Sequence, residues 1–364
     1  MRIFNLFAFI LLVLLQACAT SSDQQVEKLA PLYFPPPPEK PRYVFERVVQ
    51  SSSQIDKKDQ TSALREMLTG ESSSAKTMAK PFDVAVCQGI IFVSDTVQRS
   101  VLVFDIPGKR FFEIGKDKPG TLRKPLGLDT DDSCNLYVAD TTTSTIMVFD
   151  QTGRYINSLG GKEWFDRLTH VAVDGEGKRI YAVDTGGVGS KNHHVRVFDV
   201  ATGKHLSDIG QRGDKQGELN LPRDIEVDDN GAVYVVDGGN FRVQIFNRDG
   251  DFVRQVGKLG RQYGHFARPK GIAINPQGNI FVSDAAHGNF QIFNPEGQLL
   301  LFVGSRSEKF ERASYMLPAG IDIDEDGRVY MIDQYFRKLD VYRPVDLKED
   351  EGFLGAWPVN SVKK

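Results

Sequence analysis

Short runs of β-branched and aromatic residues alternate with clusters of glycine, proline, asparagine and aspartate over most of the chain. Six runs end in an aspartate, and neighbouring aspartates lie 44 to 53 residues apart: Asp95, Asp140, Asp184, Asp237, Asp284 and Asp333. A second apolar run follows each aspartate, and a third precedes it and opens with proline in five of six cases. A fourth run ends in glycine in the first five repeats. Such runs are typical of β-strands, so each repeat is predicted to form four short antiparallel strands.

Four strands with apolar residues on both faces cannot bury them alone, so the six repeats must stack around a common axis. We therefore predict an all-β, six-bladed β-propeller of four-stranded antiparallel blades over residues 81–345. A helical solenoid is excluded because no period of 3.6 residues recurs. A residue that is needed once in every blade is best explained as a turn-forming hydrogen-bond acceptor, so the repeated aspartates are interpreted as structural.

The ring needs a closing strand, because the sixth repeat has no clear fourth strand after Tyr342. Within residues 42–80, the run Tyr43–Val49 is the favoured donor of that strand, followed by a short helix at residues 61–70. The competing donor is the segment 352–357 of the C-terminal tail, residues 346–364.

The N-terminus has the features of an export signal. Residues 1–17 combine Arg2 with an apolar run, residues 3–15. This run is shorter than the roughly 20 residues of a membrane-spanning helix, and it fits a signal peptide. Residues 15–18, Leu-Gln-Ala-Cys, resemble the lipobox of bacterial lipoproteins. The resemblance implies lipidation at Cys18 and a place in the bacterial cell envelope, with Ala19 implying sorting to the outer membrane. The alternative is an ordinary secreted protein.

Residues 18–41 then read as a tether, because the four prolines 35–38 favour an extended polyproline II conformation. The tether would hold the folded body clear of the membrane.

Composition narrows the possible functions. Hydrophobic residues make up 40% of the chain, which excludes disorder of the whole chain, and the net charge of −3 gives no overall reason to expect nucleic acid. Three cysteines are too few for a disulfide scaffold. An oxidising compartment would permit a bond between Cys87 and Cys134, but we expect the turns of adjacent blades to diverge and keep them apart.

The repeats resemble the NHL-repeat family across residues 81–343. The fourth repeat matches best, through residues 221–228, 234–237 and 240–246. Propeller connectivity then implies a top face, formed by the loops between blades and the turns between second and third strands. The five inter-blade loops carry 14 Lys and Arg against 7 Asp and Glu, whereas acidic residues dominate the opposite turns. The resemblance therefore implies a basic top face that attracts anionic partners.

We predict that this face makes the chain a binding scaffold with a monomeric body and no cofactor or metal. Its partner would be an anionic protein, an envelope glycan or a lipid phosphate. Export makes nucleic acid an unsuitable partner. The predicted partner-binding residues are Arg212, His193, His194, Arg223, Arg261, Arg268 and Lys270. The two histidines follow a glycine-rich insertion, residues 185–192, and adjacent strand residues point in opposite directions, so they would not share one ion.

The alternative is an enzyme. Six-bladed relatives include metal-dependent lactonases and a lyase that place metal ligands at the channel mouth. The lyase's histidine positions correspond here to Phe82, Leu126, Thr169, Arg223, Lys270 and Ala319, and none is a histidine or carboxylate. In the next ring of positions, Asp83, His170 and Asp224 can converge on one divalent cation, calcium or zinc, in a hydrolase or lyase. The competing interpretation is that the two aspartates accept backbone N–H groups from the neighbouring loop.

Overall fold

A computed structural model describes residues 30–55, 75–355 and 357 of the 364-residue chain. Two compact units are distinguished, and the larger one, Leu32–Val359, holds the repeats. The signal segment, Cys18, the first half of the tether and the predicted helix at 61–70 lie outside the described residues. In the described half, the prolines follow a short strand and lead into a turn at residues 37–38, so the extended polyproline II run predicted there is not observed. Within the described part of the chain, no helix has the length and apolar character needed to cross a bilayer.

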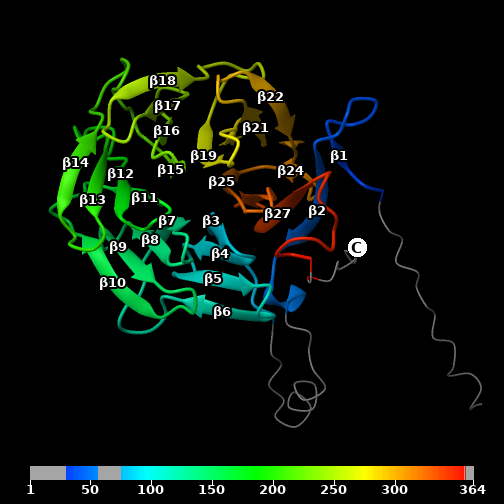
Figure 1. Cartoon of the computed structure of the whole chain (residues 1–364), viewed down its shortest axis with the longest axis horizontal. Coiled ribbons are helices and arrows are strands. Elements are labelled where there is room, and N and C mark those ends of the chain that lie inside the picture. The colour runs from blue at the N-terminus through cyan, green and yellow to red at the C-terminus, as the bar shows by residue number, and fades with distance from the viewer. Residues whose placement is uncertain (1–29, 56–74, 356, 358–364) are drawn as a thin grey trace, which may run out of the picture. The chain divides into compact units, whose positions relative to one another are not determined.

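The repeats form six four-stranded antiparallel blades around a central channel (Figure 1). The strands of the first three blades are β3 (Pro81–Cys87), β4 (Ile90–Asp95), β5 (Ser100–Asp105), β6 (Arg110–Ile114), β7 (Pro125–Thr130), β8 (Leu136–Asp140), β9 (Thr145–Phe149), β10 (Tyr155–Gly160), β11 (Leu168–Val173), β12 (Arg179–Asp184), β13 (His194–Asp199) and β14 (His205–Ile209). Those of the next two are β15 (Ile225–Val227), β16 (Val233–Asp237), β17 (Arg242–Phe246), β18 (Phe252–Val256), β19 (Pro269–Ile274), β20 (Ile280–Asp284), β21 (Asn289–Phe293) and β22 (Leu299–Val303). The predicted fold class is therefore confirmed.

The sixth blade joins the two ends of the repeat region. Its strands β25 (Pro318–Ile323), β26 (Val329–Asp333) and β27 (Lys338–Pro344) are followed in the sheet by β2 (Tyr43–Val49) and then by β1 (Tyr33–Phe34). The favoured closing strand is thus the one observed, with Phe45 opposite Tyr342. Residues 352–355 and 357 form no strand. A short parallel pair, β23 (Ser305–Arg306) and β24 (Ser314–Tyr315), lies in the loop before this blade.

The core lies between neighbouring blades. Phe92 and Val103 of the first blade, for example, pack in one buried cluster with Val138 and Phe149 of the second. Each blade thus buries one apolar face against the next, which removes apolar surface from water on both. This explains why the sequence must repeat the same apolar pattern in every unit.

The repeated aspartates are structural, as predicted. Asp95 accepts hydrogen bonds from the backbone N–H groups of Ala79 (2.6 Å) and Lys80 (2.9 Å), which precede the first strand. Its other oxygen accepts from the turn after β4, at Val97 (3.0 Å) and Gln98 (2.9 Å). Equivalent bonds form at Asp140, Asp184, Asp237, Asp284 and Asp333. Each aspartate therefore fixes two adjoining segments of the top face.

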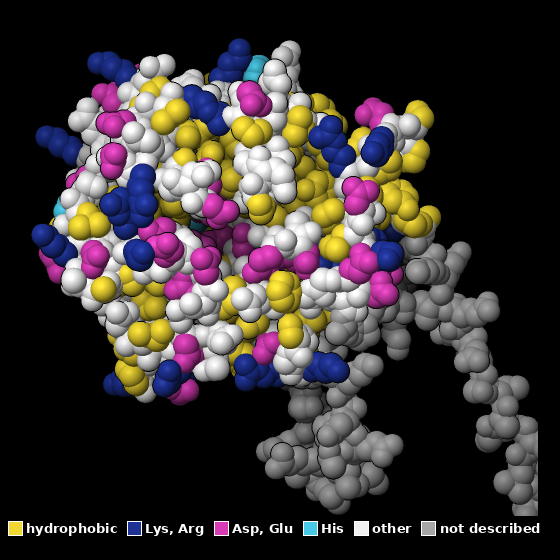
Figure 2. Space-filling model, viewed as in Figure 1, with side chains coloured by type: hydrophobic (Ala, Val, Ile, Leu, Met, Phe, Trp, Pro, Cys, Tyr) yellow, Lys and Arg dark blue, Asp and Glu magenta, His cyan; other side chains and the backbone are white. Residues whose placement is uncertain are grey.

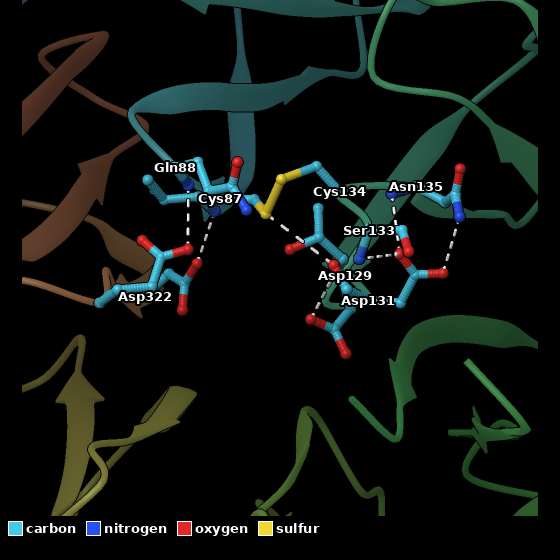
Figure 3. The surroundings of a disulfide bond; sticks show 11 residues. Cys87, Gln88, Asp129, Asp131, Ser133, Cys134, Asn135 and Asp322 are labelled. Atoms are coloured by element: carbon cyan, nitrogen blue, oxygen red, sulfur yellow. Dashed lines mark hydrogen bonds between the residues drawn. A yellow bond between two sulfur atoms is a disulfide. The ribbon is translucent and has the colours of Figure 1, made fainter. Parts of the chain in front are cut away.

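Cys87 and Cys134 form a disulfide, so the expectation that these turns diverge is wrong (Figure 3). Cys87 ends β3, and Cys134 lies in the turn between β7 and β8. Their Cα atoms are 5.6 Å apart. The turns of outer strands diverge in a propeller, but these turns belong to the innermost strands, which converge around the channel. The bond therefore joins the first two blades close to the axis.

Candidate functional site

A cavity of about 240 Å³ lies at the top end of the channel. It is formed where the first strands begin and where second strands turn into third strands. All six positions of the ring predicted from the sequence line it: Phe82, Leu126, Thr169, Arg223, Lys270 and Ala319. In every blade, the residue that follows the strand-opening position therefore lies at the mouth of the channel.

Five cationic side chains surround this mouth, one from each of the first five blades: Lys80, Lys124, Arg167, Arg223 and Lys270. Among the residues that the structure describes, no Asp or Glu belongs to this lining. None of the five side chains makes a hydrogen bond or ion pair with another residue of the described ranges. Their charges are therefore not neutralised by the fold itself.

The two cations that lie deepest repel their neighbours. Burial lowers the pKa of Lys270 to about 8, and the nearby charges of Arg223, Arg268 and Arg167 act in the same direction. Burial likewise lowers the pKa of Arg223, again with Arg167 and Arg268 contributing. An anion placed between these groups would remove this repulsion, because an opposite charge favours the charged form of each.

His170 forms the floor of the mouth and is neutral. Its side chain lines the cavity but is only 8% exposed as a residue. Burial, with Lys270 and Arg223 beside it, lowers the pKa of His170 to about 3. The ring lies 5.6 Å from that of Phe82, centroid to centroid, and its Nδ1 atom is buried without a hydrogen-bond partner.

Below this floor the lining of the channel changes from cationic side chains to carboxyl groups. Five carboxylates line its lower part: Asp83, Asp129, Asp224, Glu226 and Asp322. Burial raises the pKa of all five, to about 7 for Asp83 and Asp129. Figure 2 shows Asp and Glu side chains gathered around the central hollow of the face in view. The channel therefore runs from a cationic mouth to an acidic interior.

Four of these carboxylates link adjacent blades. Each accepts a backbone N–H from the first strand of the next blade, Asp83 from Leu128 (2.9 Å) and Asp224 from Ile272 (2.9 Å). Asp129 and Asp322 make the same bond to Val173 and Val86, both at 2.7 Å. The aspartates thus bind backbone amides as the second interpretation expected, although the donors lie in the neighbouring strand and not in a loop.

Asp83, His170 and Asp224 also converge as the enzyme alternative required. One ligand atom from each lies within 4.8 Å of the others, and all three residues are buried. His170 Nε2 lies 4.0 Å from Asp224 Oδ1. One imidazole nitrogen and two carboxylates are a donor set that a divalent cation can use. His170 is neutral, as a ligand must be. Its Nδ1 atom, however, lacks the hydrogen-bond partner that usually orients a metal-binding histidine.

The other predicted partner-binding residues lie outside this cavity. His193 is fully buried; its Nε2 contacts the Gly187 carbonyl (3.0 Å) and its Nδ1 accepts from the Leu221 N–H (3.3 Å). His194 is also buried. The guanidinium of Arg212 donates to carbonyls of the glycine-rich insertion, at Val188 and Ser190. His193 and Arg212 thus contact the insertion, and neither histidine is the free surface group that was expected.

Arg261 and Arg268 are exposed on the surface beyond the cavity lining. Sequence reasoning did not select Lys80, Lys124 and Arg167 for the site. The available signal was their position, since each directly precedes the residue that opens a first strand.

The buried carboxylates predict a pH dependence of stability. Burial raises the pKa of Asp129 from 3.8 to about 7, so its stabilising contribution is present in acid and is lost as the pH rises through about 7. Between pH 5.5 and 8 this loss is about 2 kcal/mol. Asp129→Asn keeps an acceptor oxygen for Val173 but carries no charge. We expect calorimetry to show a smaller fall in stability between these pH values for the variant.

The matched control is Asp132→Asn, at an exposed neighbouring carboxylate. It should follow the wild-type pH dependence. Parallel curves for wild type and Asp129→Asn would show that the Asp129 carboxyl does not titrate in this range.

The NHL repeat family matches residues 219–246 and 266–293, which contain β15–β17 and β19–β21. The RING finger protein nhl-1 of Caenorhabditis elegans is 46% identical over 55 residues, which are 15% of this chain and 6% of the nematode protein. The matched segment thus spans a small part of that curated relative.

Solved structures share the fold. A protein of unknown function from Bacteroides thetaiotaomicron aligns with a TM-score of 0.59 and 18% identity, over 82% of this chain and 75% of its own. A gluconolactonase from Xanthomonas campestris aligns with a TM-score of 0.55 and 15% identity, over 84% of this chain and 99% of its own. Streptogramin B lyase aligns with a TM-score of 0.54 and 11% identity, over 73% of this chain and 94% of its own. At these identities the likeness concerns the fold alone. The chain is therefore a six-bladed β-propeller in which the repeats of the fourth and fifth blades match the NHL repeat family.

Proposed function

We propose that this propeller is a non-enzymatic binding scaffold whose cationic mouth receives an anionic group of a partner. The observation that carries the proposal is the set of five unpaired cations around one cavity, with no carboxylate in its lining. Two of them, Arg223 and Lys270, are partly buried, and this burial together with nearby arginines lowers their pKa. Unneutralised like charges in a recess cost stability, and a folded protein recovers this cost when an anion binds.

The proposal includes an envelope location. Lipidation at Cys18 would anchor the chain to the outer membrane, and the tether would hold the propeller away from it. The Cys87–Cys134 disulfide supports export, since such bonds persist in oxidising compartments. Cell fractionation with a Cys18→Ser control tests this part: the wild type should sediment with membranes and the variant should be soluble in the periplasm. A wild type that stays in the cytosol would contradict the anchor.

Salt dependence tests the binding function. The probe is a fluorescein-labelled peptide of alternating glutamate and glycine, ten residues long, titrated with the protein expressed without its signal segment. Because several cations contact the ligand, we expect its dissociation constant to rise at least tenfold between 50 and 300 mM NaCl. An affinity that does not change with salt, or no binding at 50 mM, would contradict the cationic mouth as a docking site.

A second candidate function is a cation-dependent hydrolase or lyase centred on Asp83, His170 and Asp224. The 4.8 Å convergence of these groups favours it, and a lactonase and a lyase are among the proteins that share the fold. Calcium or zinc would supply a Lewis acid there. Metal analysis after dialysis distinguishes the candidates: one retained ion per chain, lost in His170→Ala, supports the enzyme. The absence of a retained ion supports the scaffold.

A further inference from the structure

The sixth blade contributes no cation to the mouth. At the two positions where other blades place Lys or Arg, the sixth blade has Leu317 and Ala319, and Gln334 also belongs to the cavity lining. Apolar side chains lie beside them instead. Phe310 is 47% exposed, Leu317 36% and Tyr335 54%. Together with Phe336 these residues form what we call the blade-six patch.

The three aromatic rings of the patch form a continuous cluster that adjoins the mouth. The ring of Phe336 contacts those of Phe310 and Tyr335, with centroids 5.7 and 5.1 Å apart. Tyr335 directly follows Gln334, a residue of the cavity wall, and the Gln334 N–H donates to the Leu317 carbonyl (3.0 Å). An anion held in the mouth would therefore lie next to an apolar surface.

The backbone beneath the patch is fixed before any ligand arrives. The Asp333 carboxylate accepts the N–H groups of Leu317 (2.9 Å) and Phe336 (2.8 Å). This is the same device that holds the cation-bearing loops of the other blades. A prearranged surface loses less entropy on binding than a mobile one.

The lysine beneath the patch is not accessible to a ligand. Lys338 is buried, and its Nζ atom lies 5.6 Å from the ring of Phe310 and 2.7 Å from Asp340 Oδ2. Its charge is thus neutralised within the blade. The patch presents apolar surface only, and aromatic groups clustered beside a charged recess are typical of protein interfaces.

We infer that the mouth and the blade-six patch form one docking surface for an acidic segment of a protein partner. The segment carries a large apolar side chain within a few residues of the carboxylate that enters the mouth. This inference rests on the proposed function and adds the class of partner. A protein is favoured over a membrane because Arg223 and Lys270 are recessed. A protruding side chain reaches such a recess, whereas a flat lipid surface contacts mainly its rim.

Two labelled peptides test the inference: the glutamate–glycine peptide above, and the same peptide with two glycines replaced by phenylalanine. At 50 mM NaCl we expect the phenylalanine peptide to bind at least tenfold more tightly. Tyr335→Ser should reduce this difference to less than threefold. Leu317→Ser provides a second, independent change in the patch with the same expected direction. Val253→Ser, at an exposed apolar residue of β18 (55% exposed), is the matched control and should leave the difference unchanged.

The results of these binding measurements distinguish a failure of the inference from a failure of the proposed function. Equal affinity of the two peptides would overturn the inference and leave the cationic mouth standing. If neither peptide binds at 50 mM NaCl, both the proposed function and the inference fail. Phosphatidylglycerol vesicles are the third probe. Vesicle binding that exceeds peptide binding and is lost in Tyr335→Ser would assign the surface to a membrane and overturn the inference.

Discussion

Reversing the charge of the two deepest cations, in the double variant Arg223→Glu and Lys270→Glu, should weaken binding of the acidic peptide at least a hundredfold. The change replaces two attractive charges in a partly buried recess with two repulsive ones, where electrostatic interactions are screened less than at the surface. About 1.4 kcal/mol for each reversed residue already gives a hundredfold change. Fluorescence anisotropy at 50 mM NaCl measures it.

Stability distinguishes a binding role from a structural one. Neither side chain has a partner in the described fold, and both lie among like charges. The double variant should therefore unfold at the same urea concentration as the wild type or a higher one, even though its binding is lost. The matched control is Lys204→Glu, an exposed cation in the outer turn of the third blade, which should alter binding less than threefold. Undiminished binding by the double variant would contradict the proposal that the anion binds at the cationic mouth.

Asp140→Ala should destabilise the propeller by about 4 kcal/mol, since it leaves four partly buried backbone donors without an acceptor. The fully buried carboxylate accepts the N–H groups of Arg123 (2.5 Å) and Lys124 (2.8 Å) through Oδ2. Its Oδ1 accepts those of Thr142 (3.0 Å) and Thr143 (3.1 Å). Losing these bonds releases both the loop that carries Lys124 and the turn after β8. Urea unfolding measures the effect.

The control for this variant is Asp117→Ala, at an exposed carboxylate of the same inter-blade loop. It should change stability by less than about 0.5 kcal/mol. A wild-type unfolding midpoint for Asp140→Ala would contradict the structural role of the repeated aspartates. The binding of the acidic peptide should also fall in Asp140→Ala at temperatures where it remains folded, because Lys124 is then no longer held at the mouth.

The sequence was sufficient for the fold because its signals are local and repeated. The strand-ending aspartates and strand-opening prolines determine the register within each blade, and six recurrences determine the blade number. The same register identified the ring from Phe82 to Ala319 that lines the mouth. The closing strand Tyr43–Val49 could also be identified, because the sixth repeat lacked one.

The features that could not be predicted from the sequence depend on distances between blades. The Cys87–Cys134 bond requires the inner turns to approach, which no single repeat encodes. The acidic lower channel arises from five residues of four repeats. Asp129, Glu226 and Asp322 each lie four residues after a strand-opening proline, but only three of the six repeats carry a carboxylate there, so the position did not stand out as a site. His193 was expected on the surface because it follows a glycine-rich insertion, but the insertion folds back and covers its ring.

Zero-length carbodiimide cross-linking locates the docked anion most directly, because the reagent joins a carboxylate to a lysine amine only when the two are in contact. The phenylalanine peptide is cross-linked to the protein at 50 mM NaCl, and mass spectrometry identifies the modified lysines. The account predicts adducts at Lys80, Lys124 and Lys270, suppressed at 300 mM NaCl. Adducts confined to lysines away from the mouth, such as Lys178 and Lys204, would contradict it.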